Sequence, residues 1–384
     1  MIKEEIYNFR KNKCCTLLGV GPMSLNCVNA TIDIANTYEI PIFLISSRRQ
    51  IDSKKQGSGY VNNWDTETFA NYVSGRDKKN FIYLSRDHGG PWQNPIENKY
   101  SLNEAMESAK YSYTKDIEAG YKIIHIDPSI EPNKKPSLNQ ILERVFELYE
   151  HCWAESNRLN KDIAFEVGTE EQTSSTNTFE SFEYTLNEVK KFCNSNKLPT
   201  PLFMVAQTGT KVMEMRNIGS FELPLRIKNQ LPSEILLPKV LEICGRYNVL
   251  MKEHNADYLS NASLGWHPRL GIHAANVAPE FGVKESKTFL EILEKNNFNH
   301  LSEKFIELAL ESKKWEKWII KNSCASLKEK ALISGHYIFS TPKFIEIKNE
   351  AIKALAKKGL DLDAILYSEV KKSILRYIKN FKII

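Results

Sequence analysis

Two histidines in this 384-residue chain stand where they could bind a metal ion. His88 follows the apolar run Phe81–Ser85, and His254 follows the apolar run Asn248–Lys252. Imidazole nitrogens are common ligands of Zn2+, Mn2+ and related divalent ions. Either histidine alone is better explained as a half-buried, hydrogen-bonded residue. Their matching positions after two separate runs, however, favour metal ligation.

Carboxylates at the ends of other apolar runs could complete such a site. Asp127 follows one of these runs, Glu166 lies at the end of another, and Glu170 comes four residues later. Asp87 directly precedes His88. We expect Asp127 to be a metal ligand and Glu166 to contact the substrate. Asp87 and Glu170 are the candidates for acid or base chemistry beside the metal ion.

Eight short apolar runs alternate with amphipathic stretches, and these elements must position the polar groups. The runs are Cys14–Val20, Pro41–Ser46, Phe81–Ser85, Tyr121–Ile126, Ile163–Val167, Pro201–Ala206, Asn248–Lys252 and Leu270–Ala275. They are rich in Ile, Val, Leu and Phe, as buried parallel strands are. Capping-box signatures, Ser101 with Glu104 and Ser137 with Gln140, open two of the intervening helices. This pattern predicts an α/β fold, a TIM (β/α)8 barrel.

The C-terminal part of the chain is expected to be organised differently. Strand candidates thin out after residue 295, and the segments Lys304–Lys330 and Pro342–Asn380 have helical patterns. We predict a barrel over residues 1–295 and a helical extension over residues 296–384 that packs on it. An open, doubly wound sheet is the alternative arrangement of eight strands, although no GxGxxG follows the first one.

Catalytic and binding groups of a barrel sit at the C-terminal ends of its strands, and this rule selects further residues. His125 lies one position before the end of its run, on the opposite face from Ile126, and its role is left open. Lys211, after the sixth run, and the dibasic pair Arg48-Arg49, after the second, are candidates for binding a phosphate group. A solvated surface charge is the alternative for each of them.

Composition and charge exclude several classes of protein. With 42% apolar and 26% charged residues, the chain is typical of a globular protein. A net charge of +5 is small for this length, so neither nucleic acid nor a membrane is an expected partner. The seven cysteines form no CxxC pair, and no apolar stretch is long enough to span a bilayer. We therefore expect a cytoplasmic protein.

Several strings of residues, taken in chain order, resemble one known family. They are Ser85-Arg-Asp-His-Gly-Gly-Pro-Trp92, Ala119-Gly-Tyr-Lys-Ile-Ile-His-Ile-Asp127, Val167-Gly-Thr-Glu170, Glu253-His-Asn-Ala-Asp-Tyr258 and His336-Tyr-Ile-Phe-Ser-Thr-Pro-Lys-Phe-Ile-Glu-Ile-Lys348. Together they are similar to the accessory (Z-type) subunit of class II D-tagatose-bisphosphate aldolase, a family also described as sugar-phosphate 4-epimerases. The similarity covers residues 13 to 380.

The resemblance implies a barrel in which a divalent metal ion polarises the carbonyl group of a ketose. It implies that Asp87 is the acid or base and that His88 is a metal ligand. Glu170 falls on the glycine-threonine motif after the fifth run, and His254 falls on the histidine after the seventh.

The resemblance also bears on the substrate-binding residues. Asn276 falls near an asparagine that contacts substrate in the wider superfamily. Gln207 stands where the catalytic aldolases have histidine and where the accessory family has glutamine. The carboxylate that the family carries after its second strand is absent, and Ile45-Ser-Ser-Arg-Arg49 stands there instead.

These features together predict a metal-dependent epimerase that acts at C4 of a ketose or ketose phosphate. The expected cofactor is Zn2+, Mn2+ or Mg2+, and the expected chemistry is retro-aldol cleavage followed by aldol re-addition. A class II ketose-bisphosphate aldolase would use the same groups. The same barrel could also serve as a non-catalytic subunit that stabilises a separate aldolase, or bind a sugar without turnover. An aldolase subunit or a second copy of this chain is the expected protein partner.

Overall fold

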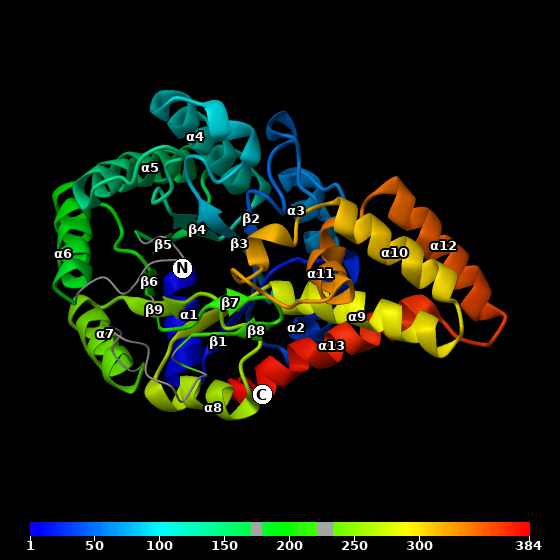
Figure 1. Cartoon of the computed structure of the whole chain (residues 1–384). Helices are drawn as coiled ribbons and strands as arrows, with labels where there is room; N and C mark the ends of the chain where they lie inside the picture. Colours follow the sequence, from blue (N-terminus) through cyan, green and yellow to red (C-terminus); the bar gives the residue numbers. More distant parts are fainter. Residues whose placement is uncertain (170–178, 207, 220, 222–232) are drawn as a thin grey trace.

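Eight parallel strands close on themselves in the order β1-β10-β9-β6-β5-β4-β3-β2, with helices around them (Figure 1). The computed structural model describes residues 1–169, 179–206, 208–219, 221 and 233–384. Strand β1 pairs with β10 on one side and with β2 on the other, so the sheet closes. The predicted α/β fold, a TIM barrel, is therefore confirmed, and the open doubly wound sheet is excluded.

The barrel strands occupy the predicted apolar runs. They are β1 (Leu17–Val20), β2 (Ile42–Ser47), β3 (Ile82–Gly89), β4 (Ile123–Ile126), β5 (Ala164–Val167), β6 (Phe203–Ala206), β9 (Leu250–Glu253) and β10 (Ala274–Val277). Strand β10 begins at Ala274 rather than Leu270, because Leu270 ends the preceding helix. Gly271 caps that helix at a φ of 85°, a left-handed conformation that glycine adopts without strain.

Helices connect the strands and then continue beyond the barrel. They are α1 (Ile2–Lys11), α2 (Leu25–Tyr38), α3 (Thr66–Arg76), α4 (Leu102–Ala119), α5 (Leu138–Leu159), α6 (Phe179–Ser195), α7 (Ser233–Tyr247), α8 (Asn261–Leu270), α9 (Pro279–Lys295), α10 (Asn299–Glu311), α11 (Leu327–Ser334), α12 (Pro342–Ala356) and α13 (Leu362–Asn380). Both predicted capping boxes are present, Ser101 with Glu104 and Ser137 with Gln140. Among the described residues, no helix has both the length and the apolar composition to cross a bilayer.

Helix α1 covers the N-terminal end of the barrel. Its Ile2 and Ile6 are buried in the barrel core, and the backbone N–H of Ile2 donates to Asp162 Oδ2 at 2.8 Å. Lys3 Nζ donates to Thr200 Oγ1, also at 2.8 Å, in the segment before β6. The C-terminal ends of the strands, with their polar residues, therefore lie at the opposite end of the barrel.

The C-terminal extension has a hydrophobic cluster of its own, which shares two helices with the barrel. Phe281 on α9 and Ile374 on α13 belong to the barrel core. Phe289 on α9 and Leu366 on α13 belong to the second cluster, with residues of α10, α11 and α12. Figure 1 shows these helices beside the barrel, with α13 returning along α9 and α2. The boundary at residue 295 stays a prediction, and the apolar contacts run across it.

A buried arginine ties the barrel to its outer helices. Arg86 on β3 donates through Nε and Nη2 to the two carboxylate oxygens of Asp116 on α4, at 2.7 and 2.5 Å. Its Nη1 donates to the carbonyl oxygens of Ser46 and Ile51, both at 2.8 Å. Burying two ions is costly, and it is offset only where hydrogen bonds replace the lost water. These four bonds supply that replacement next to the end of β2.

We expect Arg86→Met to lower the free energy of unfolding by about 3–5 kcal/mol, because Asp116 would stay buried without its partner. Adding Asp116→Leu should recover most of this loss. Lys191→Met, which breaks the exposed ion pair with Glu188, should change stability by less than about 1 kcal/mol. Urea unfolding followed by circular dichroism measures all three. An Arg86→Met protein as stable as the Lys191→Met control would contradict this account.

Candidate functional site

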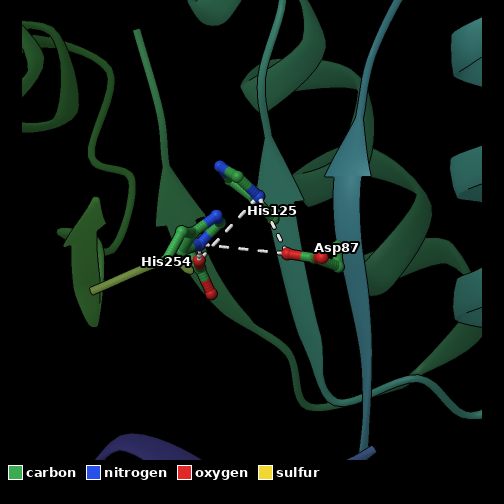
Figure 2. Close-up of side chains that lie close together, drawn as sticks. Asp87, His125 and His254 are labelled. Carbon is green, nitrogen blue, oxygen red and sulfur yellow. Dashed lines mark hydrogen bonds and ion pairs between the residues drawn. The ribbon is translucent and has the colours of Figure 1, made fainter. Parts of the chain in front are cut away.

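Four ionisable side chains converge at the C-terminal ends of the strands. Asp87 comes from β3, His125 from β4 and Glu166 from β5, and His254 directly follows β9. One ligand atom from each lies within 4.8 Å of the ligand atoms of the other three. Figure 2 shows Asp87, His125 and His254 pointing toward one another. This set of four is the four-residue cluster, and the barrel assembles it because parallel strands end on one rim.

The spacing within the four-residue cluster fits a divalent metal ion. His254 Nε2 lies 3.0 Å from Glu166 Oε1 and 3.9 Å from Asp87 Oδ1. His125 Nδ1 lies 3.8 Å from both of these carboxylate oxygens. Ligands placed tetrahedrally at about 2.1 Å from an ion would be about 3.4 Å apart. Two imidazoles and two carboxylates also form a donor set that Zn2+ or Mn2+ accepts.

Residues around the four-residue cluster hold its members in place. Lys252 Nζ donates to Glu166 Oε2 at 2.6 Å, and Asn276 Nδ2 donates to Asp87 Oδ1 at 3.2 Å. Hydrogen bonds of this kind orient ligands and are part of a working metal site. Gly168 also matters, since a Cβ atom there would lie 2.5 Å from His125 Nε2.

An irregularity in β3 sets the position of His88. The pairing of β3 with β4 shifts register between Arg86 and Gly89, and His88 adopts a φ of 45°. This left-handed conformation costs a non-glycine residue about 1–3 kcal/mol. The shift points the backbone N–H of His88 at His125 Nδ1, at 3.0 Å. His125 Nδ1 accepts this hydrogen bond with its only lone pair. A metal ion bound at Nδ1 would therefore replace the hydrogen bond.

The carboxylates of the cluster are held in their ionised forms. Burial would raise the pKa of Asp87, but His88, His125 and His254 together outweigh it and hold that pKa well below its usual range. Burial would also raise the pKa of Glu166, but Lys252, His125 and His254 together outweigh it and lower that pKa to about 2. Metal ions bind the deprotonated form of a carboxylate, so both groups are ready to act as ligands.

His88 and Asp127 lie beside the four-residue cluster and form a chain of contacts with it. Asp127 Oδ2 is 2.8 Å from His88 Nδ1, and His88 Nε2 is 3.2 Å from His254 Nδ1. Burial lowers the pKa of His88, but Asp87 and Asp127 outweigh it and raise it to about 9. His88 thus links Asp127 to His254. The metal-binding roles of His88 and Asp127 stay predictions.

A cavity of about 450 Å3 opens at the four-residue cluster, a volume suited to a small-molecule ligand. Asp87 and His254 line it, whereas His125 and Glu166 lie deeper, with 1% and 0% of their side chains exposed. The C-terminal extension also lines the cavity, through residues that include Trp318. Asp87 is therefore the cluster's carboxylate that a ligand in the cavity would meet.

Of the predicted phosphate ligands, Arg49 lines the cavity, whereas Arg48 and Lys211 do not. Arg48 is buried and forms ion pairs with Asp52, at 2.9 Å, and with Glu97, at 2.6 Å, so its charge is already matched. Lys211 is exposed, and its backbone N–H donates to Asn217 Oδ1. Neither residue is among the described residues that line the cavity.

Two predicted site residues, Glu170 and Gln207, fall outside the described residues. The sequence patterns also miss two important residues, His125 and Lys252. They give His125 no role, and they mark Lys252 only as the end of an apolar run. The register of β4 with β5 pairs His125 with Glu166. A charged residue inside an apolar run is itself a signal, because a buried lysine requires a carboxylate partner.

Comparison with solved structures supports the fold. A probable tagatose 6 phosphate kinase from Sinorhizobium meliloti 1021 matches with a TM-score of 0.74 at 16% identity, over 95% of this chain and 100% of that chain. The fructuronate-tagaturonate epimerase UxaE from Cohnella laeviribosi matches with a TM-score of 0.59 at 10% identity, over 96% of this chain and 81% of that one. No protein-family model and no curated protein sequence matches the chain. At these identities the likeness establishes a shared fold, the barrel that the sequence motifs imply.

Metal titration distinguishes the four-residue cluster from a site built on His88. We expect His125→Ala to weaken Zn2+ binding by more than about 100-fold and His88→Ala by about 10–100-fold, the range typical of residues that only orient a ligand. His300→Ala, on the exposed surface of α10, should bind Zn2+ like the unaltered protein. Calorimetry on metal-stripped protein measures these affinities. Stronger loss in His88→Ala than in His125→Ala would contradict the assignment.

Proposed function

We propose that this chain is a metal-dependent epimerase that inverts C4 of a ketose or ketose phosphate in carbohydrate metabolism. The observation that carries the proposal is the four-residue cluster, with Asp87 facing a cavity of about 450 Å3. The motifs shared with the sugar-phosphate 4-epimerase family support it. So does the barrel fold shared with UxaE, which is itself an epimerase of sugar acids.

The four-residue cluster would hold the metal ion, through His125 Nδ1, His254 Nε2, Glu166 Oε1 and Asp87 Oδ1. A divalent ion at such a site supplies Lewis-acid chemistry, by polarising a carbonyl oxygen of the substrate. Glu166 is fully buried and paired with Lys252, so its part is to hold the ion. Asn276 keeps Asp87 oriented toward the cavity through its hydrogen bond.

Asp87 is the residue that would move the proton, through Oδ2, since Oδ1 is the oxygen that would hold the metal ion. As the C3–C4 bond of the substrate breaks, Asp87 takes the proton of the C4 hydroxyl group, and C4 becomes an aldehyde carbon. The three-carbon fragment keeps the bonding electrons as an enediolate. When the aldehyde presents its other face, the C3–C4 bond forms again and Asp87 returns the proton to the new C4 hydroxyl group. No atom is gained or lost, and C4 is inverted.

The aldolase and the non-catalytic subunit differ from this proposal only in what becomes of the substrate. An aldolase would release the two fragments after the bond breaks, and a non-catalytic subunit would leave the sugar unchanged.

We also propose the cytoplasm as the compartment, a second copy of this chain or an aldolase subunit as the protein partner, and catalytic support from Glu170. Seven free thiols, five of them buried, are suited to a reducing compartment.

Isotope labelling tests the bond that breaks. In D2O with Zn2+ or Mn2+, we expect fructose 6-phosphate to yield tagatose 6-phosphate that carries no deuterium at C4, because the C4–H bond is never broken. Proton NMR measures both conversion and label. Deuterium at C4 would contradict retro-aldol chemistry. Accumulating three-carbon products would identify an aldolase, and no conversion of phosphorylated or carboxylated ketoses would favour the non-catalytic subunit.

Replacing the proton acceptor tests the role of Asp87. We expect Asp87→Asn to lower kcat by about 10²–10⁴-fold in saturating metal, because an amide cannot accept the hydroxyl proton. Metal content, measured on the same samples, separates loss of the base from loss of the ion. His300→Ala should retain its kcat. An Asp87→Asn enzyme with its metal and an unchanged kcat would rule out this role.

A further inference from the structure

Two cations line the cavity together with members of the four-residue cluster. Arg49 follows β2, and Lys317 belongs to the short 3-10 helix Glu316–Trp318 of the C-terminal extension. Both line the same cavity as Asp87 and His254. The cavity wall thus combines carboxylate and imidazole groups with two cations, and the two cations come from distant parts of the chain.

Hydrogen bonds fix both segments in place. The backbone N–H of Glu214, in the turn between β7 (Val212–Met213) and β8 (Arg216–Asn217), donates to the carbonyl oxygen of Trp318 at 2.7 Å. Ser340 Oγ donates to the carbonyl oxygen of Tyr60 at 2.9 Å, and Asn63 Nδ2 donates to that of Ser340 at 3.2 Å. The extension is therefore joined to the β2 loop that carries Arg49, and to the ribbon that follows β6.

Aromatic rings support the lysine. Lys317 Nζ lies 4.6 Å from the ring centre of Trp318 and 5.4 Å from that of Tyr337. Trp318 Nε1 donates to the hydroxyl group of Tyr337 at 3.2 Å, and the Tyr337 ring packs on Tyr60 at a centroid distance of 4.7 Å. Such rings attract a cation, and they leave its N–H donors available to a further partner.

Neither cation forms an ion pair with any of the described residues, and Lys317 stands close to the positive charges of Arg49 and Lys314. Crowding by protein atoms, followed by the charges of Arg49 and Lys314, lowers the pKa of Lys317 to about 7. Nearby Arg48, by contrast, is fully matched by Asp52 and Glu97. Two like charges held together without a carboxylate are an unfavourable arrangement, which a bound anion would relieve.

We propose that Arg49 and Lys317 bind the terminal oxyanion of the sugar, a phosphate or a carboxylate group, while its carbonyl end lies at the four-residue cluster. A planar guanidinium recognises two oxygens of such a group at once, and an ammonium adds a point charge. The sugar as the ligand rests on the proposed function. The oxyanion subsite itself rests on the position of these two cations in the cavity. The extension thereby has a specific role, since it contributes half of this subsite.

Binding measurements test the subsite without requiring turnover. We expect Arg49→Gln and Lys317→Gln each to raise the Kd for the charged sugar by about tenfold or more, and to leave the Kd for uncharged fructose unchanged. The probes are fructose 6-phosphate, fructuronate and fructose, titrated by calorimetry into the metal-loaded, full-length protein. Tighter binding of fructose 6-phosphate than of fructuronate would identify a phosphate subsite, and the reverse would identify a carboxylate subsite.

Lys321→Gln is the matched control, because Lys321 lies on the same extension and is exposed but lines a different surface depression. It should bind all three sugars like the unaltered protein, and Lys317→Arg should retain tight binding of the charged sugar. Thermal unfolding confirms that each variant is folded. The subsite is ruled out if the Arg49 and Lys317 variants bind the charged sugars unchanged, if Lys321→Gln loses as much, or if neither charged sugar binds better than fructose. Absence of epimerisation, with these binding results intact, would count against the proposed function alone.

Discussion

The buried ion pair between Lys252 and Glu166 is the interaction on which the site depends. Lys252 Nζ lies 2.6 Å from Glu166 Oε2, and neither side chain is more than 1% exposed. The rings of Phe43 and Phe203 flank the ammonium, at 5.7 and 5.5 Å. Removing these two ions from water costs several kcal/mol for each ion. Most barrels fill such interior positions with branched aliphatic residues instead. The pair therefore lowers the stability of the fold, but it keeps the Glu166 carboxylate ionised and correctly oriented beneath the cavity.

The register shift in β3 also fixes the geometry of the site. Without the register shift after Arg86, alternation along the strand would send Asp87 and His88 to opposite faces. The left-handed conformation of His88 lets both residues reach the cavity, with its backbone bonded to His125. The strained backbone is held by the packing around it, which includes the Arg86–Asp116 pair two residues before His88. Strain of this kind is concentrated at functional sites, and here it lies next to the four-residue cluster.

The parts of the fold that depend on local pattern could be predicted from the sequence, and the parts that depend on register could not. Hydrophobic periodicity predicts the eight strands, and capping residues predict the starts of α4 and α5. The rim of the barrel then brings Asp87 and His254 together. His125 required the pairing of β4 with β5, which no local pattern contains. Arg48 looks available for a phosphate in the sequence because one of its two partners, Glu97, is distant along the chain.

The C-terminal extension is held on the barrel by a shared hydrophobic core. Helices α9 and α13 each contribute to both hydrophobic clusters, so the extension is packed on the barrel through apolar contacts at its base. Such a base holds Lys317 in the cavity wall, close enough to Arg49 for their charges to interact. A flexible attachment would not hold the two cations together. In the proposed oxyanion subsite, the shared core of α9 and α13 would contribute to recognition as the two cations do, because it holds Lys317 in place relative to the barrel.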